Sequence, residues 1–147
     1  MKSFQFSLAK MRSYKEQVLE KEKIALRQLQ AEKAKIETDI ENLENHRKAR
    51  EQEFKESKNG LMASDLMLYK FHSENTRLQL NNLYEELRRA EARIEAQIKV
   101  VVAASQEVSG LDKLEEKQLE EYKYLEAKEL QEEILEMVAN KSAEEEQ

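Results

Sequence analysis

Apolar residues seven positions apart run through most of this sequence, and this repeat constrains the fold more than any other feature. A seven-residue repeat places one apolar stripe along a helix and pairs that stripe with a second helix in a coiled coil. The chain is therefore predicted to be all-α. The repeat is strongest in the C-terminal half, in the series Leu80, Leu87, Ile94, Val101 and Val108 and its companion series Leu83, Ala90, Ala104 and Leu111.

A similar but less regular repeat occupies the N-terminal half and predicts a helix from about residue 6 to about residue 57. Charged residues such as Lys15, Glu22 and Glu32 interrupt it at positions that the seam would reserve for apolar side chains. Its members are Phe4, Met11, Val18 and Ala25 in one series and Leu8, Leu29, Ile36 and Leu43 in the other.

The composition agrees with a narrow seam rather than a thick core. Charged residues make up 38% of the chain and apolar residues 39%, against about 25% and about 45–50% in an average domain. There is no proline to break a helix, and glycine occurs twice. Cysteine is also absent from the sequence, so disulfides and thiolate chemistry are excluded.

The two repeats are out of phase, which predicts a chain reversal between them. From Leu43 to Leu80 is 37 residues, or five heptads plus two. The break falls at Lys58, Asn59 and Gly60, where Asn and Gly can adopt the left-handed conformation that ends a helix. We expect a loop at 58–63 and a second, longer helix at about 64–140, antiparallel to the first, so that residue i lies beside about residue 121 − i.

Residues 1–147 are expected to form a single coiled-coil domain, and its helix ends can be predicted in more detail. Ser64 is the expected N-cap of the second helix, and Asp65 suits the positive end of its dipole. Gly110 is expected within a continuous or gently bent helix, with a hinge as the alternative. The acidic tail 141–147 is expected to fray.

Charge and hydropathy limit the classes of partner. Residues 112–147 carry 13 acids and 5 bases, whereas residues 1–111 carry 18 acids and 20 bases, so the net charge of −6 comes from the C-terminal part. Without a concentrated basic stripe we expect no nucleic-acid partner. Without about 20 consecutive apolar residues we expect no membrane insertion, and we expect a cytoplasmic monomer.

Catalytic chemistry is not expected. The two histidines, His46 and His72, have no cluster of carboxylates or cysteines beside them in the sequence, and two isolated glycines cannot form a phosphate loop. We therefore expect no enzyme activity, metal or cofactor.

Apolar residues in excess of a two-helix seam are the candidate binding surfaces. They seal the ends of the hairpin, simply sit exposed, or contact partners. One group is Phe4, Phe6 and Tyr14; a second is Leu66, Met67, Leu68, Tyr69 and Phe71; a third is Leu119, Tyr122, Tyr124, Leu125, Leu130, Ile134 and Met137.

An ordered set of motifs resembles the FliJ family, the small coiled-coil components of the bacterial flagellar type III export apparatus. The set consists of the opening FQFSLAKMRSYKE, the loop residues Asn59 and Gly60 with Tyr69 and Phe71 after them, and the closing KLEEKQLEEYKYLEAKE from Lys113. The resemblance covers nearly the whole chain. In one departure, Tyr69 and Phe71 are two apart where the family commonly has an aromatic pair three apart, and His72 takes the expected aromatic place.

The resemblance implies a stalk similar to the central subunit of rotary ATPases. Its paired helix ends would enter the pore of the hexameric, FliI-like export ATPase, and its loop-proximal end would reach the FlhA-like export gate protein at the membrane. Binding of export chaperones is a further family property. The implied ATPase contacts are Phe4, Phe6, Leu8, Met11, Lys113, Leu114, Lys117 and Tyr122, and the implied gate contacts are Leu66, Tyr69, Phe71 and His72.

Two other functions stay open. One is the equivalent stalk of a virulence type III secretion system, which differs in its cargo. The other is a structural homodimeric coiled-coil scaffold that has no motor partner.

Overall fold

The computed structural model describes residues 2–57 and 62–146, and it is a hairpin of two long helices. Helix α1 is Ala9–Glu56 and helix α2 is Ala63–Glu145. The described residues contain no strand. The prediction of an all-α antiparallel hairpin with a longer second helix is confirmed. The predicted reversal at Lys58, Asn59 and Gly60 lies outside the described residues.

The start of α2 is close to the predicted position, but its cap is a different residue. The backbone N–H of Leu66 donates to the Met62 carbonyl at 3.2 Å, so Met62 is the N-cap. The Met62 N–H in turn donates to Asp65 Oδ2 at 3.0 Å. The prediction of Ser64 as the N-cap is wrong because Asp65, three residues after the cap, reaches back to satisfy the cap's own N–H, as in half of a capping box.

The start of α1 is later than the predicted residue 6. The first helical hydrogen bond runs from the Arg12 N–H to the Leu8 carbonyl, at 2.9 Å. Residues 2–6 are not helical. Phe4 packs on Tyr122 and Phe6 is buried, and these contacts hold the N-terminal segment off the helical path.

The C-terminal part of α2 is more helical than predicted. The helix runs to Glu145 rather than ending near 140, because the residues after Asn140 include no glycine or proline and are mostly good helix formers. Helix α2 also continues through Gly110, which confirms the prediction of an unbroken helix there and leaves no break for a hinge.

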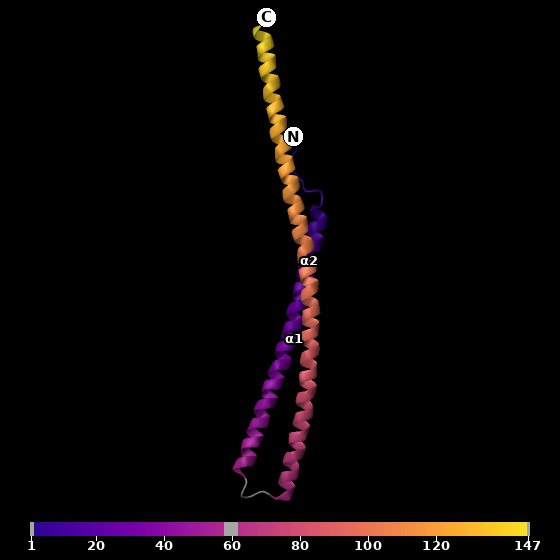
Figure 1. Ribbon diagram of the computed structural model, residues 1–147, viewed down its shortest axis with the longest axis vertical. Coiled ribbons are helices and arrows are strands. Elements are labelled where there is room, and N and C mark those ends of the chain that lie inside the picture. Colours follow the sequence, from indigo (N-terminus) through magenta and orange to yellow (C-terminus); the bar gives the residue numbers. More distant parts are fainter. Residues whose placement is uncertain (1, 58–61, 147) are drawn as a thin grey trace. The chain divides into compact units, whose positions relative to one another are not determined.

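By their contacts, the described residues form two compact units, each built from parts of both helices. Unit 1 lies within Met1–Lys21 and Val102–Gln147, and unit 2 lies within Glu22–Val101. In unit 2 the two helices lie side by side and run in opposite directions (Figure 1).

On α2 the seam of unit 2 follows the predicted heptads. On α1 it departs from them, because Ile40 is buried although it belongs to neither predicted series, and Glu32, a predicted seam position, is exposed. On α2 the covered side chains recur at alternating intervals of three and four from Leu80 to Val101. Ile40, Leu80 and Thr76 are buried, and Ala90 is only 1% exposed. A side chain as small as alanine is covered this completely only where two helices approach closely.

Polar residues at seam positions find partners across the hairpin. Gln97 occupies a slot of the apolar companion series and donates from Nε2 to the Glu22 carbonyl at 3.0 Å and to Glu22 Oε2 at 2.6 Å. In unit 1, Lys15 Nζ lies 2.9 Å from Glu107 Oε2. The charged interruptions at Lys15 and Glu22 are therefore accommodated by complementary groups on α2.

These cross-helix contacts confirm the predicted register. The residue numbers of the pairs Lys15–Glu107, Glu22–Gln97 and Phe54–Tyr69 add to between 119 and 123, close to the expected 121. The pair Arg12–Glu115 departs furthest from this sum, because the long side chain of Arg12 reaches along α2.

Replacement of Ala90 by leucine tests the close approach of the helices. We expect Ala90→Leu to lower the free energy of unfolding by about 1–3 kcal/mol, because the added atoms have no space in the seam. Ala92→Leu is the matched control, since Ala92 is exposed, and its effect should stay within about 0.5 kcal/mol. Urea denaturation of both variants measures the difference, and equal values would contradict the packing.

Replacement of Gly110 by alanine tests the continuity of α2. A Cβ atom at Gly110 would meet nothing within 4 Å, and the backbone there has no positive φ. We expect Gly110→Ala to raise the free energy of unfolding by about 0.5–1 kcal/mol, because alanine is the better helix former. A loss of stability in the same measurement would show that the glycine is needed for a break.

Candidate partner-binding surfaces

The N-terminal segment in unit 1 is anchored by Phe6 and Arg12. Phe6 is 8% exposed. The Arg12 guanidinium carbon lies 5.4 Å from the centre of its ring, within the range of a cation–π contact. Arg12 also forms ion pairs with Glu115 and, at 3.7 Å, with Asp112. One side chain of α1 therefore ties the segment to α2.

A second anchor lies further out on α2, at Tyr122. The rings of Phe4 and Tyr122 have their centres 5.6 Å apart and are tilted by 55°. The Tyr122 hydroxyl donates a hydrogen bond to the Lys2 carbonyl. Between the two anchors, Ser7 Oγ donates to Gln118 Oε1 at 3.5 Å. Residues 2–7 thus follow the surface of α2 where α1 no longer covers it (Figure 1).

The surroundings of Tyr122 alter its acidity. Withdrawal of the hydroxyl from water raises the pKa of Tyr122 above its ordinary value, and the hydrogen bond and negative charge of Glu126, with the charge of Glu129, raise it further. The neutral phenol is therefore the form that the folded segment stabilises. The contribution of this group to the free energy of unfolding is complete below the ordinary pKa of tyrosine, and it is lost as the pH rises through the raised pKa.

All eight residues assigned to the ATPase contact by resemblance lie in unit 1, but they do not form one exposed patch. Phe6 is buried, and Phe4, Leu8, Leu114 and Tyr122 are half-buried in contacts within the unit. The exposed members are Met11, Lys113 and Lys117. Tyr14, also exposed, adds an aromatic side chain to this end.

At the loop-proximal end of unit 2 an aromatic stack joins the helices. The rings of Phe54 on α1 and Tyr69 on α2 have their centres 4.1 Å apart and are nearly parallel, at 13°. A hollow of about 280 Å³ lies against this stack, lined in part by Arg50 and His72. Phe54 is not among the predicted surface residues, although the predicted register places it beside residue 67, within one turn of Tyr69.

The four predicted gate residues divide between the seam and the surface. Tyr69 and His72 are half-buried, whereas Leu66 and Phe71 are exposed, Phe71 by 66%. The Phe71 ring packs edge-on against the His72 ring, with centres 5.8 Å apart. Met62 and Met67 extend the exposed apolar surface beyond the predicted set.

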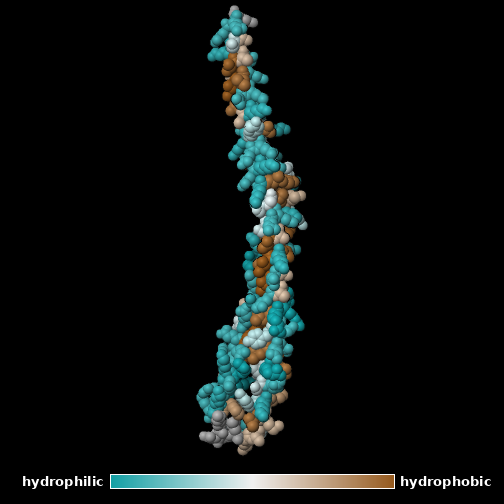
Figure 2. Space-filling model, in the orientation of Figure 1, coloured by the Kyte–Doolittle hydropathy of each residue, from teal (hydrophilic) through white to brown (hydrophobic). Residues whose placement is uncertain are grey.

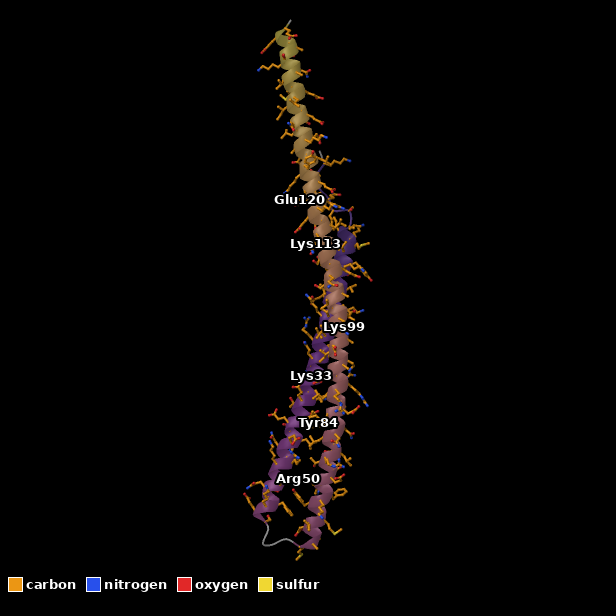
Figure 3. All side chains as sticks on the ribbon, in the orientation of Figure 1. Lys33, Arg50, Tyr84, Lys99, Lys113 and Glu120 are labelled. Atoms are coloured by element: carbon orange, nitrogen blue, oxygen red, sulfur yellow. The ribbon has the colours of Figure 1, made fainter. Side chains whose placement is uncertain are left out.

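The third surface is the part of α2 beyond Tyr122. Every residue from 123 to 146 is exposed. In Figure 3 the side chains beyond the labelled Glu120 project outwards from a single helix, and Figure 2 shows hydrophobic side chains gathered on this part. Its large exposed apolar residues are Tyr124, Leu125, Leu130, Ile134, Leu135, Met137 and Val138.

Throughout residues 2–57 and 62–146, no group of three or more His, Asp or Glu side chains is arranged to hold a metal ion. Neither helix, within the same ranges, contains an apolar stretch of the length that a membrane span requires. Scans against protein-family models, curated proteins and solved structures each returned no match to the chain.

Removal of the Phe4 ring tests the packing around Tyr122. Because withdrawal from water is the largest cause of the raised pKa, we expect Phe4→Ala to move the Tyr122 pKa back toward its ordinary value. The Tyr122 titration is obtained from the ultraviolet absorbance of tyrosinate, as the difference between each protein and its Tyr122→Phe counterpart. Phe71→Ala, in unit 2, is the control and should leave this titration unchanged. An identical titration in the Phe4→Ala protein would contradict the observed contact.

Proposed function

We propose that this protein is a non-enzymatic stalk of a flagellar type III export apparatus, which binds the hexameric export ATPase and couples it to the export gate. The proposal rests first on the resemblance to the FliJ family. In this function the chemistry of ATP hydrolysis belongs to the partner ring. The stalk contributes two binding surfaces joined by long helices.

The observation that carries the proposal is the asymmetric end in unit 1. There α1 pairs with α2 up to the N-terminal segment, while α2 continues alone to Glu145. An end of this kind presents different side chains on different sides, as a stalk that contacts non-equivalent subunits of a ring requires. Met11, Lys113 and Lys117 are the exposed candidates for contact with the ring.

The loop-proximal surface of unit 2 supports contact with a second partner. Exposed apolar side chains gather there at the N-cap and on the first turns of α2, at Met62, Leu66, Met67, Leu68 and Phe71. On soluble proteins, a contiguous exposed apolar surface commonly marks an interaction site. In the proposed function this surface binds the FlhA-like gate protein, and export chaperones are further candidate partners.

A homodimeric scaffold is the second candidate function. Each unit already pairs its α1 and α2 segments within one chain, through contacts such as Gln97 with Glu22 and Lys15 with Glu107. This internal pairing favours a monomer, whereas an obligate dimer would need another contact face. A stalk of a virulence secretion system uses the same physical design, and a comparison of binding to the two kinds of ATPase separates it from the flagellar member.

Two variants separate the proposed contacts. We expect Met11→Ala combined with Lys117→Glu to lower the apparent affinity for a FliI-like ATPase ring by about tenfold, measured as the protein concentration needed to stimulate ATP hydrolysis. Phe71→Ala should leave this stimulation intact and weaken binding to a FlhA-like gate protein. All three side chains are exposed, so thermal unfolding should change little. Stimulation that survives the Met11 and Lys117 changes would refute the assigned ring contact.

A further inference from the structure

The pattern of apolar and acidic residues along α2 changes after Tyr122. Up to that point the covered side of α2 recurs at residues 108, 111, 115, 118 and 122. The same spacing continued along the helix reaches Leu125, Glu129, Glu132 and Glu136. The side of α2 that faces α1 and the N-terminal segment therefore becomes predominantly acidic where their coverage ends, and it cannot extend the apolar seam.

A new apolar stripe begins on another side of the helix. Ala127, Leu130, Ile134 and Met137 are spaced by three, four and three, and they form what we call the C-terminal stripe. At about 100° per residue, this stripe is rotated by about 150° from the seam. Its large members are well exposed, Leu130 by 57%, Ile134 by 52% and Met137 by 71%. A stripe at this spacing is typical of a helix that packs on a partner.

The charge around the stripe selects the kind of partner. Residues 124–146 carry eight acids and two bases, a net charge of −6. Glu126, Glu133 and Glu136 lie along one side of the stripe at helical spacing. The same charge repels an anionic lipid surface, and it opposes pairing of the stripe with its counterpart in a second copy. Complementarity favours a basic surface.

We propose that residues 124–140 of α2 form a helical ligand that docks on another protein through the C-terminal stripe. The partner surface is an apolar helical face bordered by lysine and arginine. Leu130, Ile134 and Met137 are the anchors, in the spacing that helices use when they bind in grooves. The glutamates beside the stripe pair with the basic border. This docking is additional to the proposed ring and gate contacts and does not depend on the export function.

Two synthetic amphipathic peptides with the same leucine stripe test the proposal on the full-length chain. One peptide is bordered by lysine and the other by glutamate, and fluorescence anisotropy measures binding of each. We expect the lysine peptide to bind, with an affinity that falls as salt is added, and the glutamate peptide not to bind. Binding of both peptides alike, or of neither, would overturn the proposal.

Three substitutions by glutamine locate the site. Leu130→Gln should weaken binding of the lysine peptide by about tenfold, as loss of an anchor does, and Ile134→Gln should act similarly. Leu125→Gln is the matched control, because Leu125 is also well exposed, by 50%, but lies on the opposite side of the helix. All variants should retain helical content by circular dichroism. Equal losses at Leu125 and Leu130 would overturn the assignment of the stripe.

The same variants test two alternative partners of the C-terminal stripe, a lipid surface and a second copy of this chain. Binding to phosphatidylserine vesicles that Leu130→Gln abolishes would assign the stripe to lipid instead. Sedimentation that shows a dimer in the native chain and a monomer in Leu130→Gln would assign it to a second copy. We expect neither result, because the charge of this segment opposes both.

Discussion

The narrow contact between α1 and α2 is the interaction on which the rest of the structure depends. Among the described residues the buried side chains are Phe6, Ile40, Thr76, Leu80 and Ala90, and each large apolar one contributes only roughly 1.5–3 kcal/mol. Most of the stabilisation must therefore come from many half-buried side chains arranged along the seam. An arrangement of this kind depends on register, because a shift of one residue turns the stripe away from its partner by about 100°.

Polar pairs and aromatic contacts distinguish the correct register from its neighbours. If one helix shifted along the other by seven residues, the Leu, Val and Ala side chains of the seam could pair almost as well. Gln97, however, would lose both of its hydrogen bonds to Glu22. An unpaired polar group at a seam costs more than an apolar contact gains. The stack of Phe54 on Tyr69 fixes the loop-proximal end of unit 2. In unit 1, Phe4 on Tyr122 fixes the N-terminal segment.

The parts of the fold that depend on periodicity could be predicted from the sequence, and the parts that depend on a single contact could not. The heptads around Leu80, Ala90 and Val101 predicted which side of α2 is covered, because the period repeats many times. The first turn of α1 begins later than the sequence predicts, because nothing local to residues 6–8 reveals that Phe6 is buried under Arg12. The cap of α2 differs from the predicted one, because Met62 has no capping side chain that the sequence would reveal. Its role becomes visible only through the hydrogen bond to Asp65.

The candidate surfaces, too, could be predicted only in part from the sequence. Hydropathy identified the apolar residues around Phe71 and beyond Tyr122, but composition alone does not distinguish a side chain that seals the hairpin from one that is free to bind. Tyr69 and Phe71 are two residues apart, and one lies against Phe54 while the other is exposed. The change from apolar to acidic residues after Tyr122 explains where internal pairing must stop, because Glu129 and Glu136 take the seam positions that a longer α1 would have to cover. The same helix can then present its apolar residues on another side, where no segment of the described chain competes for them.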